Sequence, residues 1–91
     1  MKLDTIRKIL AAMRVMETLP ISKSPPTAGR IATRAGLPRI TAYRYLPKME
    51  TLGLVTSVFI PSKIGVFSMT DKAFHITVKS IEFLDAYKEL F

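Results

Sequence analysis

The chain has 91 residues, 48% of them hydrophobic and 23% charged, which is the size and composition of one globular domain spanning residues 1–91. It has no cysteine, which excludes disulfides and thiolate metal sites, and no apolar run approaches the roughly 18 residues of a membrane span. Fourteen Lys and Arg residues against seven Asp and Glu give a net charge of +7, and this excess favours a polyanionic partner.

Residues 2–18 have the apolar spacing of an amphipathic helix. Leu3, Ile6, Leu10 and Met13 recur at intervals of three and four residues, and charged side chains take the other side. The helix should end before Pro20, because a residue that precedes proline avoids helical dihedral angles. The segment 1–19 is therefore an N-terminal helix.

Residues 27–53 predict two short helices joined by a tight turn. Thr27 suits the N-cap of the first helix, and Gly36 suits the left-handed residue that ends it. The second helix runs from Pro38 to Gly53, and Pro47 inside it predicts a kink or a break. The positions of this second helix expected to face inward are Ala42, Leu46, Met49 and Leu52.

The hydrophobic period changes after Gly53. The β-branched and aromatic run LVTSVFI, the turn PSKIG and the returning run VFSM predict a β-hairpin of about Val55–Met69, within the segment 54–69. Thr70 and Asp71 then suit the start of a last helix that covers residues 70–91. On this interpretation His75 lies in one of the first turns of that helix.

The positive charge is concentrated in one part of the chain. No acidic residue lies between Thr18 and Met49, and the six basic residues there account for most of the net charge. Such a window predicts a basic surface patch for a polyanion, and the alternative is an ordinary solvated surface. The six residues are Lys23, Arg30, Arg34, Arg39, Arg44 and Lys48.

The order of elements, and the runs RIATRAGLPRITAYRYLPKMETLGLV and FSMTDKA, resemble winged helix-turn-helix transcription regulators of the MarR and ArsR type. In size the chain is similar to the compact regulators of archaea and their viruses. The resemblance implies an α+β fold that is mostly α: three helices, a hairpin wing and a long C-terminal helix. It also implies a cytoplasmic protein, in the host cytoplasm if the chain is viral.

The resemblance assigns residues to a double-stranded DNA site, with the second helix of the pair in the major groove. The wing tip falls on Ser62, Lys63 and Gly65. Base-reading positions fall on Arg39, Ile40, Thr41, Tyr43 and Arg44. Phosphate contacts fall on Thr27, Arg30, Arg34, Lys48 and Lys63.

The first and last helices carry more apolar residues than one core contact requires, which predicts a two-fold homodimer. Its two recognition helices would enter successive major grooves about 34 Å apart, on a pseudo-palindromic operator. The alternative is a single thick core with a frayed C-terminal end. The expected interface residues are Leu3, Ile6, Ile76, Phe83, Tyr87, Leu90 and Phe91.

The sequence does not predict an enzyme, a cofactor or a metal site. It has no carboxylate pair on a shared face and no glycine-rich phosphate loop, and its single histidine is isolated. A small-molecule effector is not indicated by any motif. The alternative function is a winged-helix module that binds protein or RNA, because the fold alone does not decide its partner.

Overall fold

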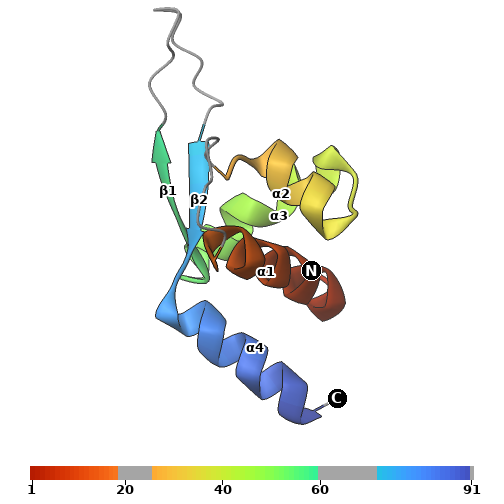
Figure 1. The fold of residues 1–91 in the computed structure, drawn as a ribbon, viewed down its shortest axis with the longest axis vertical. Coiled ribbons are helices and arrows are strands. Elements are labelled where there is room, and N and C mark those ends of the chain that lie inside the picture. The colour runs from red at the N-terminus through yellow and green to blue at the C-terminus, as the bar shows by residue number, and fades with distance from the viewer. Residues whose placement is uncertain (19–25, 60–71, 91) are drawn as a thin grey trace, which may run out of the picture.

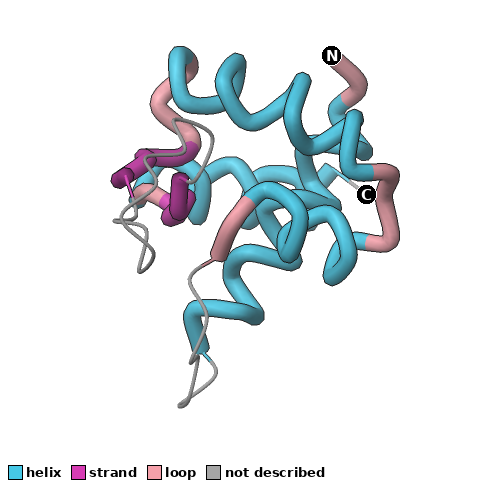
Figure 2. Tube along the Cα trace, turned by 90° about the horizontal axis from the view of Figure 1, so that it is seen from above, coloured by secondary structure: helices cyan, strands magenta, loops and turns pink. Residues whose placement is uncertain are grey.

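The computed structural model describes residues 1–18, 26–59 and 72–90, which form four helices and a two-stranded hairpin (Figure 1). Helices α1, α2 and α3 form the body, the strands lie at one side of it, and α4 lies along α1. Seen from above, the strands stand beside the helices rather than between them (Figure 2). The elements are α1 (Leu3–Thr18), α2 (Ala28–Ala35), α3 (Arg39–Thr51), β1 (Val55–Phe59), β2 (Lys72–Ile76) and α4 (Val78–Leu90).

Helix α1 places its apolar stripe in the core, as its spacing predicts. Ile9, Leu10 and Met13 are almost completely buried, and Ile6 is buried with them. Because Ile6 packs inside its own domain, the prediction that it lies in a dimer interface is wrong. Leu3, one turn earlier, is exposed.

The turn between α2 and α3 has the predicted form. Gly36 adopts φ 71°, a left-handed conformation that a residue without Cβ reaches without strain. The amide of Leu37 then donates to the carbonyl of Ala32 (2.9 Å), which closes the end of α2. This local geometry brings the start of α3 back onto α2.

Helix α3 buries one side and runs through its proline. Ala42, Leu46 and Met49 have no exposed surface, as predicted, and the helix continues through Pro47 without a break. Leu52 is 47% exposed, so the prediction that it faces inward is wrong. It follows the last helical residue, where the chain turns at Gly53 (φ 79°) and Leu54 takes the buried place instead.

The hairpin and the last helix differ from the sequence prediction. Residues 60–71, which contain the expected returning strand VFSM, lie outside the described residues. The strand that pairs with β1 is β2, which begins at Lys72, after the end of the expected hairpin at Met69. The register is antiparallel, from Val55 opposite Ile76 to Phe59 opposite Lys72. His75 and Ile76 are therefore strand residues, and the placement of Ile76 on a dimerisation helix is wrong.

Helix α4 begins at a capping box that the sequence interpretation missed. The amide of Thr77 donates to Oγ of Ser80 (3.1 Å), and the amide of Ser80 donates to Oγ1 of Thr77 (3.3 Å). The Thr77 hydroxyl also donates to the carbonyl of Gly53 (2.7 Å), and Nζ of Lys79 donates to that of Leu52 (2.8 Å). The start of α4 is thus attached to the end of α3. The helix starts at Val78 rather than at residue 70 because residues 72–76 pair with β1 as a strand.

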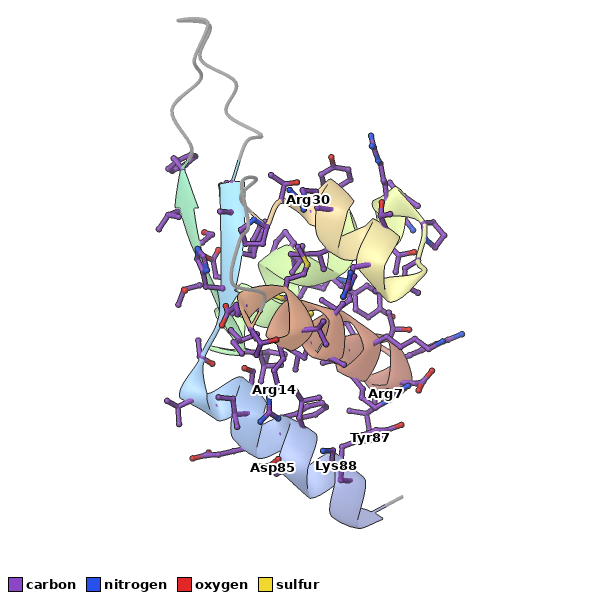
Figure 3. All side chains as sticks on the ribbon, viewed as in Figure 1. Arg7, Arg14, Arg30, Asp85, Tyr87 and Lys88 are labelled. Carbon is purple, nitrogen blue, oxygen red and sulfur yellow. The ribbon has the colours of Figure 1, made fainter. Side chains whose placement is uncertain are left out.

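The remainder of α4 packs along α1 with one side. Leu84 is buried, and Phe83 and Tyr87 are half-buried. Arg7 lies over the ring of Tyr87, 5.5 Å from its centroid, between the two helices (Figure 3). In the described part of the chain no helix has the length and apolarity needed to cross a lipid bilayer.

Candidate nucleic-acid interface

The outer side of α3 carries three exposed side chains in a row. Ile40 is 56% exposed, Tyr43 is 52% exposed, and Arg44 is exposed one turn after Ile40. Positions three and four residues apart share one face of a helix, so these three side chains form a single surface. The buried positions of α3 hold this surface away from the core.

Two of the expected base-reading residues are placed differently. Thr41 is half-buried, and its amide donates to the carbonyl of Pro38 (3.0 Å). Arg39 is exposed, but its side chain extends over α2: a Cβ built on Gly29 would lie 3.5 Å from its Nε and 3.7 Å from its guanidinium carbon. The structure therefore groups Ile40, Tyr43 and Arg44 and separates the guanidinium of Arg39 from them.

A hollow of about 630 Å³ lies where α2, the start of α3 and the end of α1 meet. Three arginines from two helices line it, together with small and hydroxyl-bearing residues. It holds three of the cations that the sequence assigned to DNA contact. The lining residues are Met16, Thr27, Gly29, Arg30, Thr33, Arg34 and Arg39.

The cations of α2 and α3 form no ion pair with any described carboxylate. The ion pairs between described residues involve Asp4, Asp85 and Glu17, with partners on α1 and on β2. None of them reaches the helix-turn-helix unit. The described cations there without a carboxylate partner are Arg30, Arg34, Arg39, Arg44 and Lys48.

The two acids that flank the basic window face the hairpin. Glu17 accepts from the amide of Ile76 (3.0 Å), and its Oε1 lies 3.6 Å from Nδ1 of His75. Glu50 accepts a hydrogen bond from the hydroxyl of Ser57. Both carboxylates therefore attach helices to strands, and neither pairs with an arginine of α2 or α3 among the described residues.

Thr27 occupies the predicted N-cap position of α2, although its side chain makes no capping hydrogen bond. The residue pairs with Ala73 in an isolated bridge, and the amide of Phe74 donates to the carbonyl of Pro26 (3.0 Å). These contacts fix the start of α2 against β2. Lys63 and the rest of the expected wing tip lie outside the described residues.

Tyr45, unlike Tyr43, has a structural role. It is half-buried against the core, and its hydroxyl accepts from the amide of Lys2 (3.1 Å). That hydrogen bond holds the pKa of Tyr45 below its usual value. The side chain attaches the start of α1 to α3 and is not part of the exposed face.

Lys72 is a cation beside this interface that the sequence interpretation missed. It lines a hollow of about 220 Å³ between α3 and β2, together with Tyr43 and Glu50. Its Nζ lies 5.1 Å from the ring centroid of Phe59 on the opposite strand. The interpretation placed Lys72 in a helix, and KAFHI offers no alternation that would have indicated a strand, because Ala73 and Phe74 are adjacent and both buried. Among the described residues no group of three potential metal ligands occurs.

Comparison with known proteins agrees with this arrangement. The sequence pattern of the IclR helix-turn-helix domain matches residues 10–58, which contain α2, α3, the C-terminal part of α1 and all but the last residue of β1. A search among curated proteins found no match.

Solved structures match over nearly the whole chain. A mutant of S. aureus MepR superposes with a TM-score of 0.69 at 15% sequence identity, covering 97% of this chain and 57% of that one. The DNA-binding TubR fragment from Clostridium botulinum has a TM-score of 0.59 at 22% identity, covering 90% and 91%. The expected fold, a mostly helical winged helix-turn-helix, is confirmed by these likenesses.

Proposed function

We propose that this chain, which belongs to the IclR helix-turn-helix domain family, binds double-stranded DNA as part of a transcription regulator. The observation that carries the proposal is the set of cations on α2 and α3 that lack a carboxylate partner among the described residues, together with the exposed face of Ile40, Tyr43 and Arg44. Membership in a helix-turn-helix family also agrees with the expectation that the chain is not an enzyme.

Base reading is assigned to the exposed face of α3. A major groove about 12 Å wide admits one helix, and Arg44 can present two parallel N–H donors to O6 and N7 of a guanine. Ile40 can contact a thymine methyl, and Tyr43 can contact the sugar or a phosphate. Thr41, which is half-buried, contributes less to this surface than its sequence position suggests.

Non-specific affinity is assigned to Arg30, Arg34 and Lys48. Each phosphate that a cation neutralises releases condensed counterions and adds about 0.9 to the slope of log affinity against log salt. Three or four such contacts per copy predict affinity that falls by orders of magnitude when salt rises a few-fold. The remaining phosphate contacts expected from the sequence are the hydroxyl of Thr27, at the start of α2, and Lys63.

Fluorescence anisotropy with a random DNA duplex, the matching single strand and an RNA duplex, each at two salt concentrations, tests this function. The expected result is tightest binding to duplex DNA, with a steep negative salt slope and a further preference for duplexes selected from a random library. Equal or tighter binding to the RNA duplex would favour the RNA-binding alternative. Absence of binding to any nucleic acid would favour a protein partner and contradict the proposal.

We also propose that two copies pair through α4 and the start of α1. Support comes from the exposed side of α4, where Val78 is 73% exposed, and from exposed Leu3 on α1. Phe83 and Tyr87 are half-buried between these elements, and the side chains of Leu90 and Phe91 lie outside the described residues. Such a dimer would place two α3 helices on one face of a pseudo-palindromic operator.

Light scattering tests the dimer. Truncation after Asp85 removes Tyr87 and the residues beyond it but keeps Leu84, so the shortened chain should fold and have the mass of one copy. The full chain at the same concentration should have the mass of two copies. Thermal unfolding of both checks that the truncated chain is folded, and a folded truncated chain that is still dimeric would refute this interface.

A further inference from the structure

The placement of Arg39 is the observation from which the inference starts. It is the first residue of α3, and its guanidinium lies over Gly29 of α2, near enough for a Cβ on Gly29 to be in contact with it. Gly29 has no side chain, so α2 presents bare backbone at this point and the guanidinium can approach it. The arginine side chain thus extends across α2 rather than out from α3.

Arg39 shares the hollow with Arg30 and Arg34. Three guanidinium groups around one hollow repel each other, and no described carboxylate pairs with any of them. The hollow between α1 and α4 is a useful contrast, because Arg7 pairs there with Asp4 (3.2 Å) and Arg14 with Asp85 (4.0 Å). Unlike the arginines of that hollow, those of the hollow of α2 and α3 have no carboxylate partner among the described residues, and they are open to an anion from outside.

We propose that Arg39, together with Arg30 and Arg34, holds one backbone phosphate of duplex DNA, and that Arg39 does not read a base. Planar guanidinium groups bind phosphate oxygens through paired N–H donors, and the groups here come from two helices whose relative position is fixed by the Gly36 turn. Base discrimination is left to Arg44. This assignment rests on the proposed DNA-binding function and reverses the role that the sequence suggested for Arg39.

The first test compares Arg39→Ala and Arg39→Lys on a selected duplex and on a random one, at four salt concentrations. If Arg39 contacts a phosphate, Arg39→Ala should lower the affinity for both duplexes by the same factor, about tenfold. It should also reduce the magnitude of the slope of log affinity against log salt by about 0.9. Arg39→Lys keeps a point charge and should bind both duplexes within about threefold of the parent. A base contact predicts instead that either variant loses the preference for the selected duplex.

The second test changes the floor of the hollow without touching the arginines. Gly29→Leu should displace the Arg39 guanidinium and reproduce the uniform loss, whereas Gly29→Ala adds a carbon at ordinary contact distance (3.5 Å) and should bind like the parent. Both variants replace a helical glycine, so their melting temperatures should not fall below that of the parent. The double variant Gly29→Leu, Arg39→Ala should bind the duplexes no more weakly than Arg39→Ala alone.

The third test identifies the phosphate. Duplexes that carry one neutral methylphosphonate linkage at successive positions should contain one position at which the parent loses several-fold more affinity than Arg39→Ala does. If no position behaves this way, the hollow is not a DNA backbone site and the inference fails. A parent chain that binds no duplex at all would instead refute the proposed function.

Discussion

Replacing Arg44 with alanine should remove most of the preference for a selected duplex while leaving the affinity for random duplex nearly unchanged. Arg44 is exposed on the same face of α3 as Ile40 and Tyr43, and no carboxylate among the described residues pairs with it. A paired contact from arginine to guanine discriminates against the wrong base by about 1–3 kcal/mol, or roughly 5- to 150-fold. Competition anisotropy between the two duplexes measures this ratio directly.

Arg14→Ala is the matched control for this substitution. It also removes an arginine side chain, but from α1. There a guanidinium nitrogen of Arg14 lies 4.0 Å from a carboxylate oxygen of Asp85 on α4, away from the helix-turn-helix unit (Figure 3). The ratio of the affinities of Arg14→Ala for the selected and the random duplex should equal that of the parent. If the Arg44 variant kept the parental ratio as well, base reading by α3 would be disproved.

Truncating Leu46 to alanine should cost about 2–5 kcal/mol of the free energy of unfolding. Leu46 has no exposed surface and lies in the core to which α1, α2 and α3 all contribute, so its removal leaves a cavity that several elements line. A chain of this length is stable by roughly 5–14 kcal/mol, and each kcal/mol lost lowers the melting temperature by about 4–8 °C. Urea titration and thermal unfolding should both record the loss.

Leu52→Ala is the control for this prediction, because the structure and the sequence interpretation expect different losses of stability at this position. The helical spacing of the sequence places Leu52 on the buried side with Leu46, whereas the structure leaves it 47% exposed after the end of α3. Its truncation should therefore change the free energy of unfolding by no more than about 0.5 kcal/mol. Equal losses at both positions would mean that α3 extends further than described.

The helix-turn-helix unit could be predicted from the sequence because its signals are local. Thr27, Gly36 and Pro38 mark the ends of helices within a few residues of where those ends occur, and the buried spacing of α3 follows from the helical period. Pro47 was expected to disturb the helix, but tertiary packing of Leu46 and Met49 on either side keeps the helical conformation.

The position of the second strand could not be predicted from local signals. Lys72–Ile76 forms a strand because it pairs with β1 and attaches to the start of α2 through Ala73 and Phe74, and both contacts are distant in sequence. The true start of α4 did have a local signal, the Thr77–Ser80 pair, but Thr70 and Asp71 gave a similar one earlier.

Within the candidate site, residue identity was predictable and side-chain direction was not. The charge window predicts a group of cations, and those of its members that the structure describes have no carboxylate partner among the described residues. The side chain of Arg39, however, extends toward a glycine ten positions earlier, and no periodicity of α3 contains that information.

The corner where α3 ends and α4 begins has a mechanical consequence. Thr77 and Lys79 donate hydrogen bonds of 2.7 and 2.8 Å to the carbonyls of Gly53 and Leu52, just before β1. A rotation of α4 relative to α3 would therefore strain these two hydrogen bonds. In a pair of copies joined along α4, the separation between the two α3 helices would then be set by this joint. The number of base pairs between half-sites would follow from its angle, and loosening the joint would broaden the range of spacings that the pair tolerates.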